Sequence, residues 1–517
     1  MAQAAVPAAA DSAMQNFQIE EESVSDEDPH QEVAHLLHGH PDHAQSIQNE
    51  PLWNRGICCV YAINFFTTFA TFHLYAPRSW LLEMAICRKF YESHDPSTIT
   101  WQSGWPGFII PEHACREKNI QKDLSHIRAL STFLEPLPAL FLSVPYGALA
   151  DAYGRKLVVC LGILGLVLSY TWYFIVCSYS NLFSTATVLA SNVFLLIGAP
   201  PAFFIASVIN LAVDLSTERT RSIRIYCLLA FHQAGSMLGA MSAALTMKIA
   251  WLPYLVALLA FLLSFFSVLT IPNTSVAASS VDRPSSSAHE ESMSDQTRTP
   301  RHDTFTSFIL HQTRSDFRLV AILIAFFLIT VRLPMGADLV LLYVSKRYHW
   351  FINQASTLIG IGRGFDLFLA VFILPRISQI LQSHCGFKAS KVDLYVARYS
   401  AALLAIGAAI AGMAPNVGLF ILGWIFYSAG FAIRMSLQAY ATALVSQHQV
   451  VKLYSVLAVV ETCGGLLGDP LLWKAWSLGL DVEGVGFGMP WFLVSLLLGL
   501  VSTILWALQG EEKSVEG

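Results

Sequence analysis

The chain has 517 residues, of which 54% are hydrophobic and only 13% are charged, and its mean hydropathy is +0.52. Soluble domains carry about 25% charged residues, so this composition excludes a string of ordinary soluble domains and indicates a polytopic membrane protein. The 31 Lys and Arg against 36 Asp and Glu give a formal net charge of −5, which offers no basic patch for nucleic acid. The apolar content also excludes a disordered or disulfide-stapled chain.

The N-terminal segment 1–55 is predicted to be a disordered, acidic, cytosolic tail. Its first 50 residues contain no Lys or Arg and no apolar core of the kind found in a signal peptide. A histidine tract in this segment has two interpretations, a metal-binding tract or part of a solvated tail (His30, His35, His38, His40 and His43). We adopt the second and expect no metal site, since no Cys and no recognised ligand spacing accompany the histidines.

Apolar segments of the length that crosses a bilayer, about 20 residues, recur along the rest of the chain. Six are predicted before residue 273 (57–77, 127–149, 157–177, 182–212, 225–247 and 251–271). Six more follow residue 316 (318–343, 353–375, 396–413, 416–442, 453–475 and 486–508). We therefore predict an all-α membrane protein with 12 transmembrane helices in two six-helix bundles, 56–272 and 317–509. A cytosolic linker, 273–316, joins the bundles, and 510–517 form a cytosolic tail.

The distribution of Lys and Arg predicts the orientation. With both termini inside, the short inner loops hold ten of these residues and the short outer loops hold four, which favours cytosolic termini. We expect the plasma membrane, with the vacuole or another endomembrane as alternatives. Residues 78–126 then form a long outer segment that contains Cys87 and Cys115. An oxidising exterior permits a disulfide between them, and two free thiols are the alternative.

A charged loop between the second and third predicted spans carries the clearest motif. Residues 147–156 read Gly-Ala-Leu-Ala-Asp-Ala-Tyr-Gly-Arg-Lys, which resembles the signature loop G-x-x-x-D-x-x-G-R-[KR] of the major facilitator superfamily. We call residues 147–156 the signature loop. Its position, the span count and the central linker all agree with that resemblance.

The resemblance implies a role for each signature position. Gly147 would let the helix end pack closely on a neighbour, and Gly154 would allow the tight reversal between two spans. Asp151 would face the N-terminus of the eleventh span, which begins near Lys452. Together the set resembles a conformational latch that breaks during transport (Gly147, Asp151, Gly154, Arg155, Lys156 and Asp214, with Arg155 paired to Asp214). The alternative is a turn whose positive charges set only the topology.

A narrower resemblance, over about residues 55–510, is to fungal facilitators. It rests on residues after the first span, near the seventh and eighth spans, and in the eleventh (Pro77, Glu83, Cys87, Tyr343 to Arg347, Trp350, Ala355, Asp393, Arg398, Val459 to Thr462, Gly468 and Pro470). That resemblance implies export of secondary metabolites. The fifth span departs from drug–proton antiporters, because Ala234 to Gly239 lack their Gly-Pro element, although Gly235 and Gly239 still offer a small-residue face for close packing.

Ionisable side chains at membrane depth cost about 2.5–3.5 kcal/mol or more and therefore point to function. Arg363 and Asp366 lie three residues apart on one helix face, either as a self-neutralising pair or as a gate pair. Arg434 and Glu461 are expected to pair across two helices. Arg332 has no carboxylate at helical spacing and is our candidate for a substrate contact, which favours anionic or carbonyl-rich substrates.

The carboxylates Glu135 and Glu461 are the candidate proton carriers, since desolvation favours the protonated form. For each, the alternative is a carboxylate held by a neighbouring helix. Glu135 precedes Pro136 and Pro138, where a kink would free backbone carbonyls.

These features predict a monomeric secondary transporter that exports a small organic compound, a secondary metabolite or toxin, by alternating access. Protons are a possible coupling ion, and no cofactor or nucleic acid is required. A proton-coupled importer of a nutrient or organic anion is the alternative. A transport-dead sensor would need a long structured cytosolic domain, and a membrane enzyme would need a catalytic motif, neither of which the sequence contains.

Overall fold

The computed structural model describes residues 54–101, 108–198, 201–271, 317–332, 335, 338–383, 389–445, 450–482 and 484–508. All of these belong to one compact unit, Trp53–Gly517. We call residues 54–271 the N-half and residues 317–508 the C-half. The histidine tract, the linker 273–316 and the tail 510–517 lie outside the described residues.

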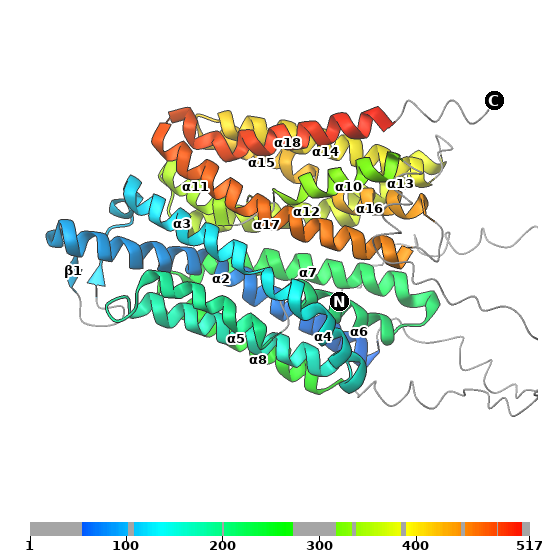
Figure 1. Cartoon of the computed structure of the whole chain (residues 1–517), viewed down its shortest axis with the longest axis horizontal. Coiled ribbons are helices and arrows are strands. Elements are labelled where there is room, and N and C mark those ends of the chain that lie inside the picture. Colours follow the sequence, from blue (N-terminus) through cyan, green and yellow to red (C-terminus); the bar gives the residue numbers. More distant parts are fainter. Residues whose placement is uncertain are drawn as a thin grey trace, which may run out of the picture. The chain divides into compact units, whose positions relative to one another are not determined.

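The N-half is helical (Figure 1) and is made of α2 Arg55–His94, α3 Lys118–Leu134, α4 Leu137–Tyr153, α5 Arg155–Ser178, α6 Pro201–Asp214, α7 Glu218–Thr246 and α8 Leu252–Leu269. Its 3₁₀ segments are η1 Pro96–Thr98, η2 Ala114–Arg116 and η3 Thr185–Leu196. Two short strands, β1 Thr100–Trp101 and β2 Phe108–Ile109, pair antiparallel with Thr100 opposite Ile109.

The C-half is built the same way, from α10 Phe317–Thr330, α11 Asp338–Tyr348, α12 Ile352–Phe368, α13 Leu374–Ser383, α14 Ala389–Met413, α15 Val417–Ala429, α16 Ile433–Ala443, α17 Val450–Val482 and α18 Met489–Ala507. A π-helix, η6 Leu369–Ile373, joins α12 to α13, and a 3₁₀ segment, η8 Gly484–Gly488, precedes α18. Asn416 caps α15 by accepting the Leu419 N–H at 2.9 Å, as Asn54 caps α2 through the Ile57 N–H.

Nine helical segments among the described residues are long and apolar enough to cross a membrane (Arg55–His94, Arg155–Ser178, Ile223–Thr246, Leu252–Leu269, Ile352–Ser383, Ala389–Met413, Val417–Ala443, Leu453–Val482 and Gly484–Ala507). Each falls on a span that the sequence predicts. The all-α class of multi-pass membrane protein is thus confirmed, apart from the two-residue strands.

The other three predicted spans, 127–149, 182–212 and 318–343, are each divided into two helical pieces (α3 with α4, η3 with α6, and α10 with α11). A proline lies in the sequence at each division: Pro136, Pro200 and Pro334. Proline removes a backbone donor and clashes with the preceding turn, so a continuous α-helix is interrupted there.

The first outer segment differs from the prediction. Residues 78–94 are not loop, because α2 continues through Pro77 to His94, and α3 already begins at Lys118. The apolar residues after Pro77 explain this extension, since Leu81, Leu82 and Ile86 are all buried. Arg78 is consequently inside a packed helix rather than in a solvated loop.

Helix α7 joins the two halves, since it packs along α2 on one side and along α12 on the other. Gly235 and Gly239 make the first contact close: a Cβ at Gly235 would lie 2.7 Å from the Phe65 carbonyl oxygen, and one at Gly239 would lie 2.5 Å from that of Phe69. The predicted small-residue face is thereby confirmed. On the other side, the Ser356 hydroxyl donates to the Ala240 carbonyl at 2.7 Å.

The hydrophobic cores show which end of the helices closes the halves on each other. One cluster lies within the N-half, around Ile57, Val159 and Phe261. The larger cluster combines C-half residues with those near Cys87 in α2 and with Leu124 in α3. We call the end of the helices near Cys87 and Cys115 the disulfide end. The opposite end, which bears residues 147–156, is the signature end. The halves therefore share a core at the disulfide end.

Candidate functional site

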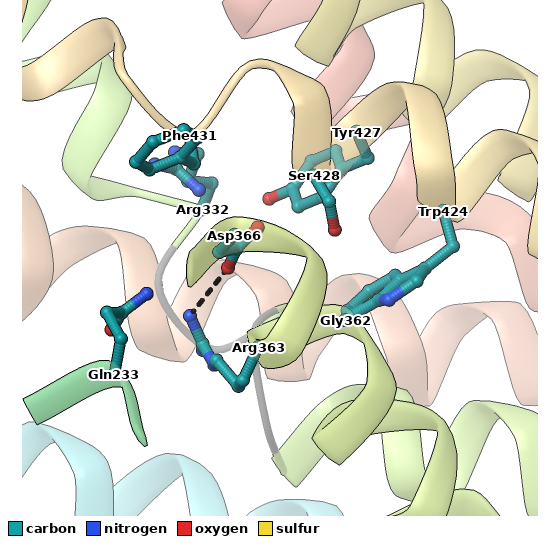
Figure 2. A pocket seen from close by; sticks show the side chains of 9 residues that line it. All are labelled: Gln233, Arg332, Gly362, Arg363, Asp366, Trp424, Tyr427, Ser428 and Phe431. Atoms are coloured by element: carbon teal, nitrogen blue, oxygen red, sulfur yellow. Dashed lines mark hydrogen bonds and ion pairs between the residues drawn. The ribbon is translucent and has the colours of Figure 1, made fainter. Parts of the chain in front are cut away.

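Three charged residues predicted to matter lie around one cavity. Arg332, Arg363 and Asp366 line a space of about 160 Å³. Figure 2 shows the lining side chains, which come from α7, α10–α11, α12 and α15 with the turn that follows it (Gln233, Arg332, Gly362, Arg363, Asp366, Trp424, Tyr427, Ser428 and Phe431). Gln233 is an N-half residue, so both halves contribute to this cavity.

Interrupted helices surround the cavity. Arg332 follows the end of α10 at Thr330, and α15 ends at Ala429 before α16 begins at Ile433. The π-helix Leu369–Ile373 starts three residues after Asp366. Such interruptions free backbone groups and are frequent at the binding sites of transporters. Local backbone geometry therefore agrees with the side chains in marking this region as a site.

The charges of the cavity are only partly neutralised. The Arg363 guanidinium lies 3.4 Å from the Asp366 carboxylate and 5.4 Å from the centroid of the Phe72 ring on α2. Arg332 interacts electrostatically with Asp366 and lies 5.8 Å from the Tyr427 ring centroid. The buried Nε of Arg332 and the buried Oδ1 of Asp366 have no hydrogen-bond partner in the described part of the chain. As far as the described residues go, these two atoms are available to a ligand.

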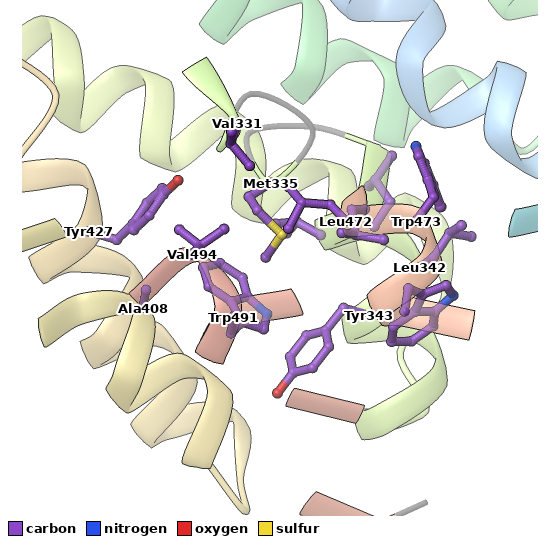
Figure 3. Packing of buried hydrophobic residues seen from close by; sticks show 14 of the residues in the cluster. Val331, Met335, Leu342, Tyr343, Ala408, Tyr427, Leu472, Trp473, Trp491 and Val494 are labelled. Carbon is purple, nitrogen blue, oxygen red and sulfur yellow. The ribbon is translucent and has the colours of Figure 1, made fainter. Parts of the chain in front are cut away.

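An aromatic wall forms one side of the cavity. The rings of Trp424 and Tyr427 stack with centroids 5.8 Å apart and planes inclined by 22°. Their indole N–H and phenol O–H are buried and have no partner among the described residues. Figure 3 shows Tyr427 beside Trp491, a fully buried α18 residue that makes edge-to-face contacts with Trp424 and Tyr427. The C-half core thus fixes this wall in place.

The predicted pair Arg434–Glu461 is present but lies outside the lining of the cavity. The guanidinium of Arg434 donates to the two carboxylate oxygens of Glu461 at 2.5 and 2.8 Å, which ties α16 to α17. Both carboxylate oxygens are thus held by one guanidinium in bidentate geometry. The contact is an interhelical bond, as expected from the sequence.

A second group of charges was not recognised in the sequence. The buried carboxylate of Asp338 lies 3.4 Å from Arg78 and 3.7 Å from Arg128, and accepts a hydrogen bond of 3.1 Å from Ser79. Arg128 also donates to the Ser79 hydroxyl at 2.7 Å. We call these four residues the outer cluster. It joins α2 and α3 of the N-half to α11 of the C-half.

Two further carboxylates face the outer cluster. Glu135 interacts electrostatically with Arg78, Arg128 and Asp338, and Asp469 of α17 interacts with Glu135 and Asp338. The Oδ1 of Asp469 is buried and has no hydrogen-bond partner in the described residues. The sequence did carry a signal for this group, since the apolar run after Pro77 implied that Arg78 continues a helix.

More contacts close the disulfide end. Cys87 and Cys115 are joined in a disulfide. Two residues close to Cys115 in the sequence contact the C-half. Arg116 donates to the Trp350 carbonyl at 2.9 Å, and the Ile352 N–H donates to the Glu112 carboxylate at 3.0 Å. Burial raises the pKa of Glu112, although the Ile352 N–H and Arg116 act in the opposite direction. The disulfide loop therefore packs on the turn between α11 and α12.

The signature loop makes contacts within the N-half. Arg155 and Asp214 form an ion pair of 3.0 Å, and Lys156 donates to the carbonyls of Leu269 and Ile271 at the end of α8. Gly154 has φ +88°, which only glycine adopts readily, in agreement with the predicted tight reversal.

The close packing expected at Gly147 is not seen in this conformation, because a Cβ there would meet no heavy atom of the described residues within 4 Å. The physical reason is that α4 packs on α3, α5, α6 and η3 of its own half, whereas the contact with α17 is made by α3. The side chains of Asp151 and Lys452 lie outside the described ones, so their predicted approach is untested.

Comparison with known proteins identifies the family. A sequence model of the Major Facilitator Superfamily matches residues 124–469, and the chain belongs to this superfamily. It is similar to the MFS efflux pump atnC of Emericella nidulans, with 28% identity over 85% of this chain and 84% of the relative. It is also similar to the efflux pump ustT of Aspergillus flavus, with 23% identity over 79% of each chain.

Solved structures agree on the fold. The human organic anion transporter MFSD10 (TETRAN) is similar with a TM-score of 0.52 and 18% identity, over 88% of this chain and 100% of that chain. A D-xylose-proton symporter gives a TM-score of 0.57 at 12% identity, over 87% and 97% of the two chains. The protein is therefore an integral, multi-pass secondary transporter with the major facilitator fold, and family and fold are those of transporters rather than enzymes.

Proposed function

We propose that the protein exports a small organic compound of the secondary-metabolite type by alternating access, with the cavity around Arg332 and Asp366 as its transport site. The observation that carries this proposal is a set of buried polar atoms that have no hydrogen-bond partner among the described residues and lie in a cavity lined by both halves. Leaving such an atom unpaired costs about 1–3 kcal/mol, so a binding partner is expected there. Export is favoured over uptake because similar fungal proteins are described as efflux pumps.

The contacts between the halves support a state that is closed at the disulfide end. The outer cluster and the contacts of Glu112 and Arg116 all lie at that end. During transport these contacts would break while the signature end closes around Asp151. The variant Asp151→Asn tests this latch in proteoliposomes. If its conformational cycling is intact, Asp151 is not part of a latch at the signature end.

We further place the protein in the plasma membrane as a monomer, with the disulfide end outside and both termini in the cytosol. An oxidised Cys87–Cys115 pair agrees with an outer location for that end. Impermeant labels applied to intact cells would reach a tag in the disulfide loop, and not one at either terminus, if this orientation is correct.

Deletion of the gene in its host tests the direction of transport. Loss of an exporter should raise the intracellular amount of the exported compound several-fold and lower its amount in the medium, measured by mass spectrometry of both fractions. Reintroduced wild-type protein should reverse both changes. Reduced uptake of an external compound, with no intracellular accumulation, would instead identify an importer.

A further inference from the structure

The cavity combines an excess of positive charge with a flat aromatic wall. Its nine lining residues include two guanidinium groups and one carboxylate, which leaves a formal charge of +1. Asp366 already pairs with Arg363, whereas Arg332 has no ion pair within the described residues. A ligand that carries one negative charge would make the cavity neutral.

The position of the unpaired guanidinium indicates where the negative group binds. Figure 2 shows Arg332 on the Phe431 side of Asp366, with Tyr427 and Ser428 across the cavity. The planar fork of arginine offers parallel N–H donors that match the two oxygens of a carboxylate. The buried Nε of Arg332, which has no acceptor among the residues that the structure describes, is one of these donors.

The remaining groups fit the rest of such a ligand. Trp424 and Tyr427 present nearly parallel rings and two donors without a partner in the described part of the chain, the indole N–H and the phenol O–H. Both residues are more than nine-tenths buried, at 6% and 4% exposure. The free Oδ1 of Asp366 is an acceptor for a hydroxyl or amine. A volume of about 160 Å³ accommodates a single substituted ring in this conformation.

We propose that the transported compound is an organic anion with a carboxylate, or an equally delocalised oxyanion, on a planar conjugated ring that also carries a hydrogen-bond donor. The anion binds Arg332, the ring lies on Trp424 and Tyr427, and the donor reaches Asp366. This inference rests on the proposed function, because it takes the cavity to be the transport site.

Salicylate is a suitable probe, since it has a carboxylate, one ring and a hydroxyl. Purified full-length protein in nanodiscs is titrated with salicylate and with neutral salicylamide, and binding is followed by equilibrium dialysis of the radiolabelled probes. We expect salicylate to bind at least about tenfold more tightly, the effect of one charge-assisted hydrogen bond. Arg332→Gln should reduce the affinity for salicylate to that for salicylamide. Arg332→Lys should retain part of the preference for salicylate.

Lys474→Gln is the matched control, because it removes one positive charge from an exposed α17 position away from the cavity. It should leave the preference unchanged, and thermal unfolding should show that all variants are folded. Equal binding of the amide, or a preference that survives Arg332→Gln, would overturn the inference.

Flux in proteoliposomes separates this inference from the proposed function. If salicylamide is transported as well as salicylate, the protein is a transporter and the proposed substrate class is wrong. A different result would be that salicylate binds with the expected preference, but no salicylate crosses the membrane and host deletion causes no accumulation. The protein would then bind the proposed class of compound, and the export function would be rejected.

Discussion

At the scale of single residues, the cavity depends on a close approach between α12 and the aromatic wall. A Cβ at Gly362 would lie 2.5 Å from the indole nitrogen of Trp424. Trp424 cannot move away easily, because Trp491 and Tyr427 pack against it. Because Gly362 has no side chain, the indole N–H of Trp424 can lie at the edge of the cavity.

Gly362→Ala is expected to reduce transport at least about fivefold and to lower the melting temperature by several degrees, since overpacking costs about 1–3 kcal/mol. Transport is measured as efflux from cells at matched expression, and stability by thermal unfolding of purified protein. Gly499→Ala is the control, because a Cβ there meets nothing within 4 Å. The double variant Gly362→Ala/Trp424→Phe should regain stability. Wild-type transport and stability in Gly362→Ala would contradict the packing argument.

The charged half of the cavity was predictable from the sequence, but Trp424 in its aromatic wall was not. Arg332, Arg363 and Asp366 stand out because an ionised side chain at membrane depth is costly and rare. Trp424 does not stand out, since it is one of 12 Trp residues in a chain that also contains 33 Phe, and its sequence context does not separate it from the others. Only the fold distinguishes an aromatic ring that lines a cavity from one that does not.

At the scale of helices, the outer cluster joins the halves through a single carboxylate. Asp338 of α11 is the shared partner of Arg78 on α2 and Arg128 on α3. The side chain of Arg128 is 1% exposed, and Asp338 is the carboxylate with which it forms an ion pair. Removing one member of a buried ion pair destabilises by about 3–5 kcal/mol, which is enough to bias the closed arrangement.

Asp338→Asn should therefore open the disulfide end. The readout is labelling by an impermeant maleimide of a cysteine at Ser345, a residue that is 2% exposed, in a background that retains only Cys87 and Cys115. We expect labelling to accelerate at least about tenfold relative to the same background with Asp338. Asp481→Asn is the control, because its pairs with Lys118 and Lys122 are exposed and contribute about 0–1 kcal/mol. Unchanged labelling in Asp338→Asn would exclude the cluster as a closing contact.

Hydropathy predicted the positions of the membrane helices well, and the prolines predicted the break after Glu135, but the other interruptions and the course of the first outer segment were not predicted. Apolar runs identify spans regardless of local geometry, so nine spans coincide with long apolar helices in the described residues. The sequence predicts that the first span ends at residue 77 and that Arg78 lies in a loop, yet α2 continues to His94. A proline weakens only the hydrogen bonds of the preceding turn, and buried apolar neighbours maintain the helix.

At the scale of the whole molecule, the charges at the junction of the halves do not balance. The outer cluster, with Glu135 and Asp469 beside it, contains three carboxylates and two guanidinium groups. One added proton would neutralise this group in its low-dielectric surroundings. Because the group spans α2, α3, α11 and α17, we expect its proton affinity to change when the halves separate at this end, which would couple protonation to conformation.

Glu135 and Asp469 are thus better candidates for the coupling proton than Glu461, whose carboxylate is held by both donors of Arg434. Proteoliposomes distinguish coupling from transport, since substrate counterflow needs only the conformational cycle, whereas accumulation driven by a pH gradient also needs the proton step. We expect Glu135→Gln and Asp469→Asn to lose at least about 80% of gradient-driven accumulation while counterflow continues, because a neutral amide cannot exchange a proton. In Glu461→Gln, the ratio of gradient-driven accumulation to counterflow should be the same as in the wild-type protein. If both Glu135→Gln and Asp469→Asn still accumulate substrate in response to the gradient, the coupling proton is carried elsewhere or a different gradient drives export.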